Sequence, residues 1–119
     1  MKELKKGDII NIELENHGRS SVQSGYRPCV VIGTYPTCPV AIVAPLTTKK
    51  KKAHVPVHVE LKVEQVLGYL KQDSTILIEQ LTTIDRRNID ARKGKIDPES
   101  GVMEKIDEAL IRQLKIKNA

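Results

Sequence analysis

The chain has 119 residues, a formal net charge of +5 at pH 7 and only 3% aromatic residues. This length suits one domain with one core, which we assign to residues 1–119, and is too short for two. No apolar run approaches the roughly 20 residues of a membrane span, and the basic N-terminus lacks the apolar stretch of a signal peptide, so we predict a cytoplasmic protein with no membrane partner. The positive charge indicates an anionic partner, while the few aromatic rings argue against single-strand binding by rows of stacked bases.

Three strands are predicted in the first half of the chain. Residues 8–14 alternate apolar and polar side chains, which is the period of a half-buried strand. A polar loop rich in Gly and Ser follows over residues 15–25. The next strand, within residues 27–34, starts after Pro28, because a residue without a backbone donor suits the first position of a strand. The third covers residues 40–47 and ends at Thr47.

Two or three further strands are predicted in the second half. Residues 54–61 alternate, with Val55, Val57, Val59 and Leu61 on one side, and Pro56 indicates an edge position. Residues 74–81 form a fifth strand and the residues around Gly94 a short sixth.

The C-terminal segment changes to the period of a helix. Asp97 is the expected N-cap, with Pro98 at the first helical position. The sequence therefore predicts a mainly β fold with a C-terminal α-helix, in which a small curled antiparallel sheet is capped by that helix. The apolar stripe of the helix consists of Val102, Met103, Ile106, Ala109, Leu110 and Leu114.

No metal site and no cofactor are expected. His54 and His58 would point the same way on a strand but lie about 13 Å apart, too far for one ion. Cys29 and Cys38 form no Cys-x-x-Cys pair, and we expect buried reduced thiols, with a catalytic or redox role as the alternative.

Two basic features each allow two interpretations. The run Lys49, Lys50, Lys51 and Lys52 is either a solvated loop or a contact to a phosphate backbone. Arg27, at the mouth of an apolar strand, either pairs with an acidic neighbour such as Glu79 across the sheet or forms an anion site.

Six segments together resemble the MazF/PemK family of toxins from bacterial toxin–antitoxin pairs. They are "KKGDIINIEL", "GYRPCVVIG", "AIVAPLT", "HVEL", "DSTILIEQLTTID" and "MEKIDEAL". "EQLTTID" is moderately specific, and Arg-Pro before an apolar strand is weak alone. The segments occur in the family's order over nearly the whole chain, and this ordered set carries the resemblance.

The resemblance implies a small SH3-like antiparallel barrel of the CcdB/PemK type and a homodimer. It also implies metal-independent endoribonuclease activity on single-stranded RNA, and neutralisation by a cognate antitoxin. The family's catalytic arginine and threonine fall on Arg27 and Thr47. The residues expected to contact RNA are Ser21, Gln23, Thr48, Lys49, Lys50, His58, Glu79 and Gln80.

Two positions depart from the family's pattern where RNA contacts are expected. Val22 replaces a common acidic residue, and Thr82 stands where relatives usually carry arginine. For Glu79 and Gln80, a hydrogen-bonding pair that stiffens the barrel is as good an interpretation as base recognition. Two other functions stay open on this evidence, a CcdB-like toxin acting on DNA gyrase and a non-catalytic RNA-binding barrel.

Overall fold

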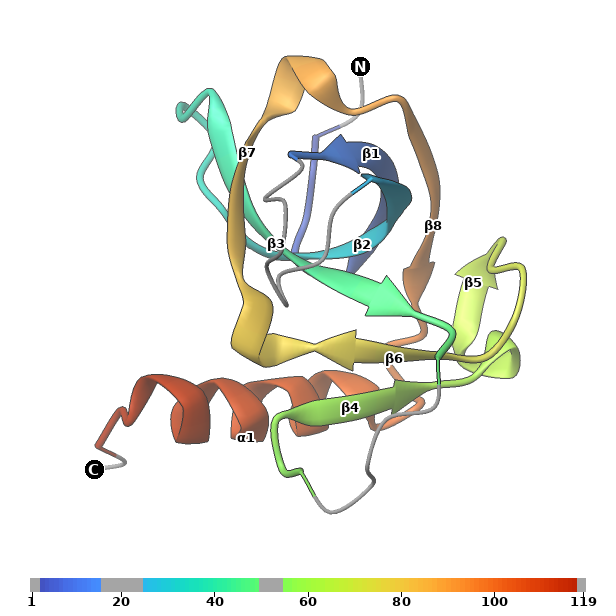
Figure 1. Cartoon of the computed structure of the whole chain (residues 1–119), viewed down its shortest axis with the longest axis vertical. Coiled ribbons are helices and arrows are strands. Elements are labelled where there is room, and N and C mark those ends of the chain that lie inside the picture. Colours follow the sequence, from blue (N-terminus) through green and yellow to red (C-terminus); the bar gives the residue numbers. More distant parts are fainter. Residues whose placement is uncertain (1–2, 16–24, 50–54, 118–119) are drawn as a thin grey trace.

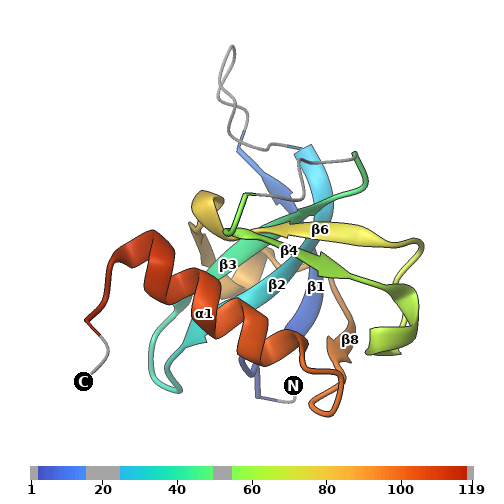
Figure 2. The same cartoon turned by 90° about the horizontal axis from the view of Figure 1, so that it is seen from below.

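The fold is one curled antiparallel sheet with a helix packed beneath it (Figures 1 and 2). The computed structural model describes residues 3–15, 25–49 and 55–117. The strands run in the order β4-β6-β3-β2-β1-β8-β5, and β7 pairs with β3. Its elements are β1 (Asp8–Leu14), β2 (Gly25–Thr34), β3 (Val40–Thr47), β4 (His58–Leu61), η1 (Val63–Gln65), β5 (Val66–Gly68), β6 (Ser74–Leu77), η2 (Ile78–Gln80), β7 (Thr82–Asp85), η3 (Arg86–Asn88), β8 (Ala91–Ile96) and α1 (Val102–Leu114).

Two irregularities bend the sheet. The register shifts between Ile9 and Ile10 where β1 pairs with β8, and between Val31 and Gly33 where β2 pairs with β3. Such bulges increase the local twist of a strand. Within the described residues no ladder joins β4 to β5, so the sheet curls like a barrel without closing.

Both faces of the central strands are buried, and this explains the continuous apolar run in β2. Val30 and Ile32 belong to the core under α1, whereas Cys29 and Val31 belong to a second core on the opposite face. We call these the helix-side core and the inner core. The helix-side core includes Ile9, Ala44, Leu46, Val59, Leu61, Ile76, Ile78, Ile106 and Ala109, and the inner core includes Ile10, Ile12, Leu14, Val43 and Ile84.

The predicted strands are confirmed in number and type for the first half, with a different start for β2. This strand begins at Gly25, so Arg27 and Pro28 lie inside it. Pro28 faces Asn11 of β1, and pairing with β3 begins only at Cys29. The missing donor of Pro28 is tolerated because the strand is paired on one side at this point.

The second half contains more and shorter strands than expected. β4 is the predicted edge strand but covers only His58–Leu61. The predicted strand 74–81 ends at Leu77 and continues as η2. The sixth strand is confirmed as β8, while β5 and β7 were missed.

The helix begins later than predicted. Its N-cap is Gly101, whereas Asp97 caps a preceding turn by accepting the N–H of Glu99 at 3.0 Å. The stripe is buried at Val102, Ile106 and Ala109, but Leu114 is 54% exposed. No helix among the described residues is long and apolar enough to cross a bilayer.

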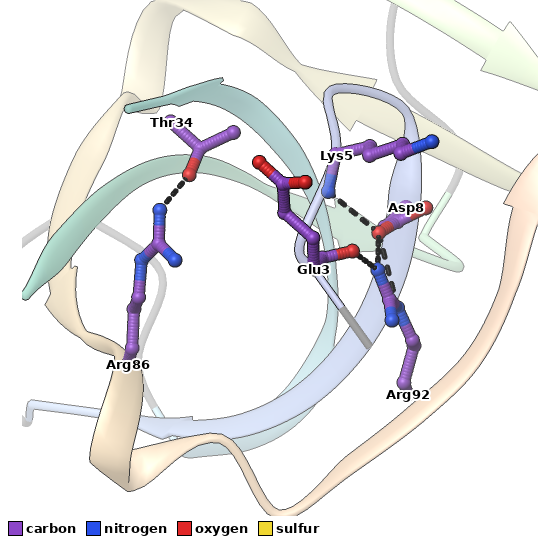
Figure 3. A network of polar contacts seen from close by, with 6 residues as sticks. All are labelled: Glu3, Lys5, Asp8, Thr34, Arg86 and Arg92. Atoms are coloured by element: carbon purple, nitrogen blue, oxygen red, sulfur yellow. Dashed lines mark hydrogen bonds and ion pairs between the residues drawn. The ribbon is translucent and has the colours of Figure 1, made fainter. Parts of the chain in front are cut away.

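A polar network ties the start of β1 to β8 (Figure 3). The buried carboxylate of Asp8 accepts the backbone N–H of Lys5 at 2.8 Å and Nε of Arg92 at 3.0 Å. Arg92 also donates through Nη2 to Asp8 and to the carbonyl of Glu3. The N-terminal segment is therefore anchored across the end of the sheet.

Asp8→Ala should lower the free energy of unfolding by about 2–3 kcal/mol, because buried donors and a charged group lose their acceptor. Urea denaturation measures the loss. The matched control is Asp107→Ala, which breaks the exposed Lys6–Asp107 pair and should cost less than about 1 kcal/mol. Equal losses in the two variants would contradict a stabilising role for the Asp8 network.

Candidate active site

Arg27 projects from a paired section of β2 near the end of β3. It lies opposite Ile12 of β1, and its Nη1 donates to the carbonyl of Leu46 at 3.2 Å. The guanidinium is thus directed toward the residues that end β3. The carboxylate of Glu79, which was the alternative partner, instead lies 2.7 Å from Nε2 of His58.

The strand register aligns Arg27 with Thr47. The ladder between β2 and β3 ends at the pair Cys29–Pro45, and extending its register by two residues beyond that end brings Arg27 level with Thr47. Thr47 is paired with Thr75, and Thr75 with Glu60. Directly opposed residues of antiparallel strands share a face. Arg27, Thr47, Thr75 and Glu60 therefore form one row across β2, β3, β6 and β4, which we propose as the catalytic row and refer to by that name.

The Thr47 side chain is held in place. The residue is 5% exposed, and its hydroxyl oxygen accepts the backbone N–H of Lys49 at 3.3 Å. A hydroxyl that accepts one hydrogen bond can still donate another. Thr48 and Lys49 are exposed directly beyond the strand.

His58 and Glu79 lie beside the catalytic row. The His58 side chain is 13% exposed, and among the described residues its Nδ1 has no hydrogen-bond partner. Glu79 is in η2, where the half-buried Gln80 accepts the hydroxyl of Thr82 through its backbone carbonyl at 3.1 Å. Glu79 belongs to a local polar pair, but its partner is His58 and not Gln80. Base recognition by Glu79 or Gln80 stays a prediction.

A cleft of about 360 Å³ meets the row at Arg27. It was not predicted, because the segment after residue 65 showed no period that would place it. The cleft combines side chains from β1, β2, β8 and the segment before β6. Its lining is Ile9, Asn11, Tyr26, Arg27, Pro28, Thr48, Tyr69, Leu70, Lys71, Gln72, Ser74 and Lys93.

Three of the expected RNA contacts, Ser21, Gln23 and Lys50, lie outside the described residues, as do Val22 and His54. Thr82 begins β7 next to η2. No group of three or more His, Cys, Asp or Glu side chains in the described part of the chain is arranged to hold a metal ion.

Cys29 is unsuited to nucleophilic chemistry although it is two residues from Arg27. It is fully buried, and burial raises the pKa of the Cys29 thiol to about 12, against the opposing effect of the Arg27 charge. The reactive form of cysteine is the thiolate, which is negligible for such a thiol near neutral pH. The expectation of two buried thiols was wrong for Cys38, which is exposed.

Comparison with known proteins shows the family to which the chain belongs. Residues 5–114 match the profile of the PemK-like, MazF-like toxin of type II toxin–antitoxin systems. The chain belongs to this toxin family. It is 37% identical over 110 residues to Endoribonuclease EndoA of Bacillus subtilis (strain 168), covering 90% of each protein.

Solved structures of the family share the fold. The Mycobacterium tuberculosis toxin MazF-mt6 superposes with a TM-score of 0.72 at 17% identity, over 93% of this chain and 99% of that one. An endoribonuclease in complex with its cognate antitoxin from Mycobacterial species gives 0.71 at 16% identity, over 98% and 100%. The mainly β architecture with one C-terminal helix, expected from the sequence pattern, is confirmed.

Thiol labelling of the native protein should modify Cys38 and spare Cys29, since only Cys38 is exposed and Cys29 stays protonated at pH 8. Mass spectrometry after iodoacetamide treatment should find one modified thiol in buffer and two in denaturant. Rapid native labelling of Cys29 would contradict its burial.

Proposed function

We propose that this toxin is an endoribonuclease that cleaves single-stranded RNA without a metal ion. Its family and the endoribonuclease relative at 37% identity support the activity. The observation that carries the proposal for the site is the β2–β3 register, which brings Arg27 level with Thr47 when it is extended two residues beyond the Cys29–Pro45 pair. The gyrase-directed and non-catalytic alternatives have no comparable support.

RNA can be cut without metal because its 2′-hydroxyl is a nucleophile already in place. The 2′-oxygen gives up its proton and attacks the adjacent phosphorus, negative charge builds on the phosphoryl oxygens, and the bond to the 5′-oxygen breaks as that oxygen takes up a proton. Arg27 fits the stabilising role, since its guanidinium is always charged and matches two phosphate oxygens. For the same reason it is a poor general base.

Thr47 and His58 supply the complementary groups. The hydroxyl of Thr47 would donate to the scissile phosphate and fix it against Arg27. His58 is two residues from Glu60 on β4, on the same face as the catalytic row, and its imidazole is the group we assign to proton transfer with the 2′-hydroxyl. Thr48 and Lys49 extend beyond the strand as phosphate contacts.

The expected partners are RNA, a cognate antitoxin and a second copy of the chain. Structures of related toxins include complexes with antitoxins. A chain of net charge +5 suits an acidic, initially disordered peptide that folds on contact.

Arg27→Ala should lower kcat by about 10²–10³-fold, because the transition state loses a positioned donor. RNA cleavage in the presence of a chelator measures the rate. Arg87→Ala is the matched control, since Arg87 lies on η3, is 87% exposed and pairs with Asp85 at the end of β7. Undiminished cleavage by Arg27→Ala would reject its catalytic role, and intact RNA with the unaltered protein would reject the nuclease.

Thr47→Val should lower kcat by about tenfold while Thr47→Ser stays near the unaltered rate, because only the serine variant keeps a hydroxyl at this position. Urea denaturation of both variants separates this effect from loss of the bond to Lys49. Equal rates for the two variants would exclude hydroxyl participation.

A further inference from the structure

We propose that the cleft beside Arg27 holds an unpaired nucleobase of the RNA, stacked on Tyr26 and Tyr69, with Lys71 and Lys93 on the neighbouring phosphates. This inference rests on the proposed function and adds a binding subsite that the sequence did not indicate. Arg27 and Thr48 also line the cleft, so the bound base would lie at the end of the β2–β3 pair that carries Arg27 and Thr47, on the strand face of Tyr26 and Pro28.

The charge of the cleft selects an anionic strand. Among the residues that the structure describes, the lining includes three cationic ones, Arg27, Lys71 and Lys93, and no Asp or Glu. A second copy of the chain docked face to face would bring the same cations against this surface, since a two-fold interface places the same patch on both partners. Like charges in such a contact repel, whereas phosphates neutralise them.

The remaining surface of the cleft suits a flat apolar ring. Tyr26 is 57% and Tyr69 59% exposed, so both rings are accessible to a ligand. Pro28 and Leu70 add apolar surface, and Asn11 and Gln72 add amide groups that can bond to a base edge. Because a tyrosine ring stacks on any base, this subsite would bind a nucleotide whatever the RNA sequence.

The pairing of β5 with β8 fixes Tyr69 relative to Lys93. Gly68 is paired with Gly94 and has φ +118, and a Cβ on it would lie 2.5 Å from the carbonyl oxygen of Lys93. The backbone N–H of Tyr69 donates to that same carbonyl at 2.9 Å. Tyr69 and Lys93 are therefore held side by side before any ligand binds, which reduces the ordering that binding requires.

Tyr69→Leu should weaken binding of a fluorescent, uniformly 2′-O-methylated single-stranded RNA by roughly 5- to 150-fold, the range of one lost stacking contact. The modified RNA has no 2′-hydroxyl and stays intact. Tyr69→Phe keeps the ring and should bind like the unaltered protein. Tyr35→Leu is the matched control, because Tyr35 is 67% exposed and does not line the cleft.

Lys93→Gln should reduce the slope of log affinity against log salt concentration by about 0.7, the value for one phosphate contact to a single strand. Lys105→Gln, an exposed lysine on α1 outside the cleft, should leave the slope unchanged. Together the two measurements test the stacking and the charge contributions separately.

Equal RNA affinity of Tyr69→Leu and Tyr35→Leu would overturn the subsite, and RNA cleavage by the unaltered protein would then leave the proposed function standing. A lower sedimentation mass of Tyr69→Leu with unchanged RNA affinity would overturn it in favour of a contact between copies. Tyr69-dependent binding without any cleavage would support the subsite and remove the nuclease.

Discussion

The pairing of β2 with β3 is the constraint on which the site depends. Its register, extended beyond the last pair, brings a permanently charged guanidinium level with a buried hydroxyl, and two hydrophobic cores hold the paired strands from both faces. The entropic cost of orienting Arg27 and Thr47 therefore arises during folding and not during substrate binding. The bond from Arg27 to the Leu46 carbonyl restricts the side chain further while leaving its charge intact.

The other elements complete this arrangement. The two bulges curl the sheet so that its outer strands, β4 and β5, bring His58 and Tyr69 to either side of the β2–β3 pair. Packing of α1 against β4 and η2 supports the strand that carries His58 (Figure 2). At the opposite end, the Asp8–Arg92 network fixes β8, which carries Lys93 (Figure 3).

Much of the fold follows from local sequence, and the failures have physical causes. β1 shows its period directly because buried Ile10, Ile12 and Leu14 alternate with polar Asn11 and Glu13, while β5 and β7 have three and four residues, too few to establish a period. Asp97 and Pro98 resemble a helix start, but Ser100 and Gly101 provide a later one. Arg27 and Thr47 were proposed as catalytic from the family's ordered segments, and their role stays a prediction. Tyr69 and Lys93 had no such signal, because only the pairing of distant strands brings them together.

The close approach of the paired residues Gly68 and Gly94 also has a genetic consequence. Any side chain introduced at Gly68 collides with main-chain atoms, so the segment must shift and carry Tyr69 with it. A cell that escapes a toxin by point mutation needs only one such change. Among cells that survive expression of the toxin, mutations in the codons of Gly68 and Gly94 should be as frequent as mutations in the codons of residues that contact the nucleic acid. Neither glycine has a side chain that could make such a contact.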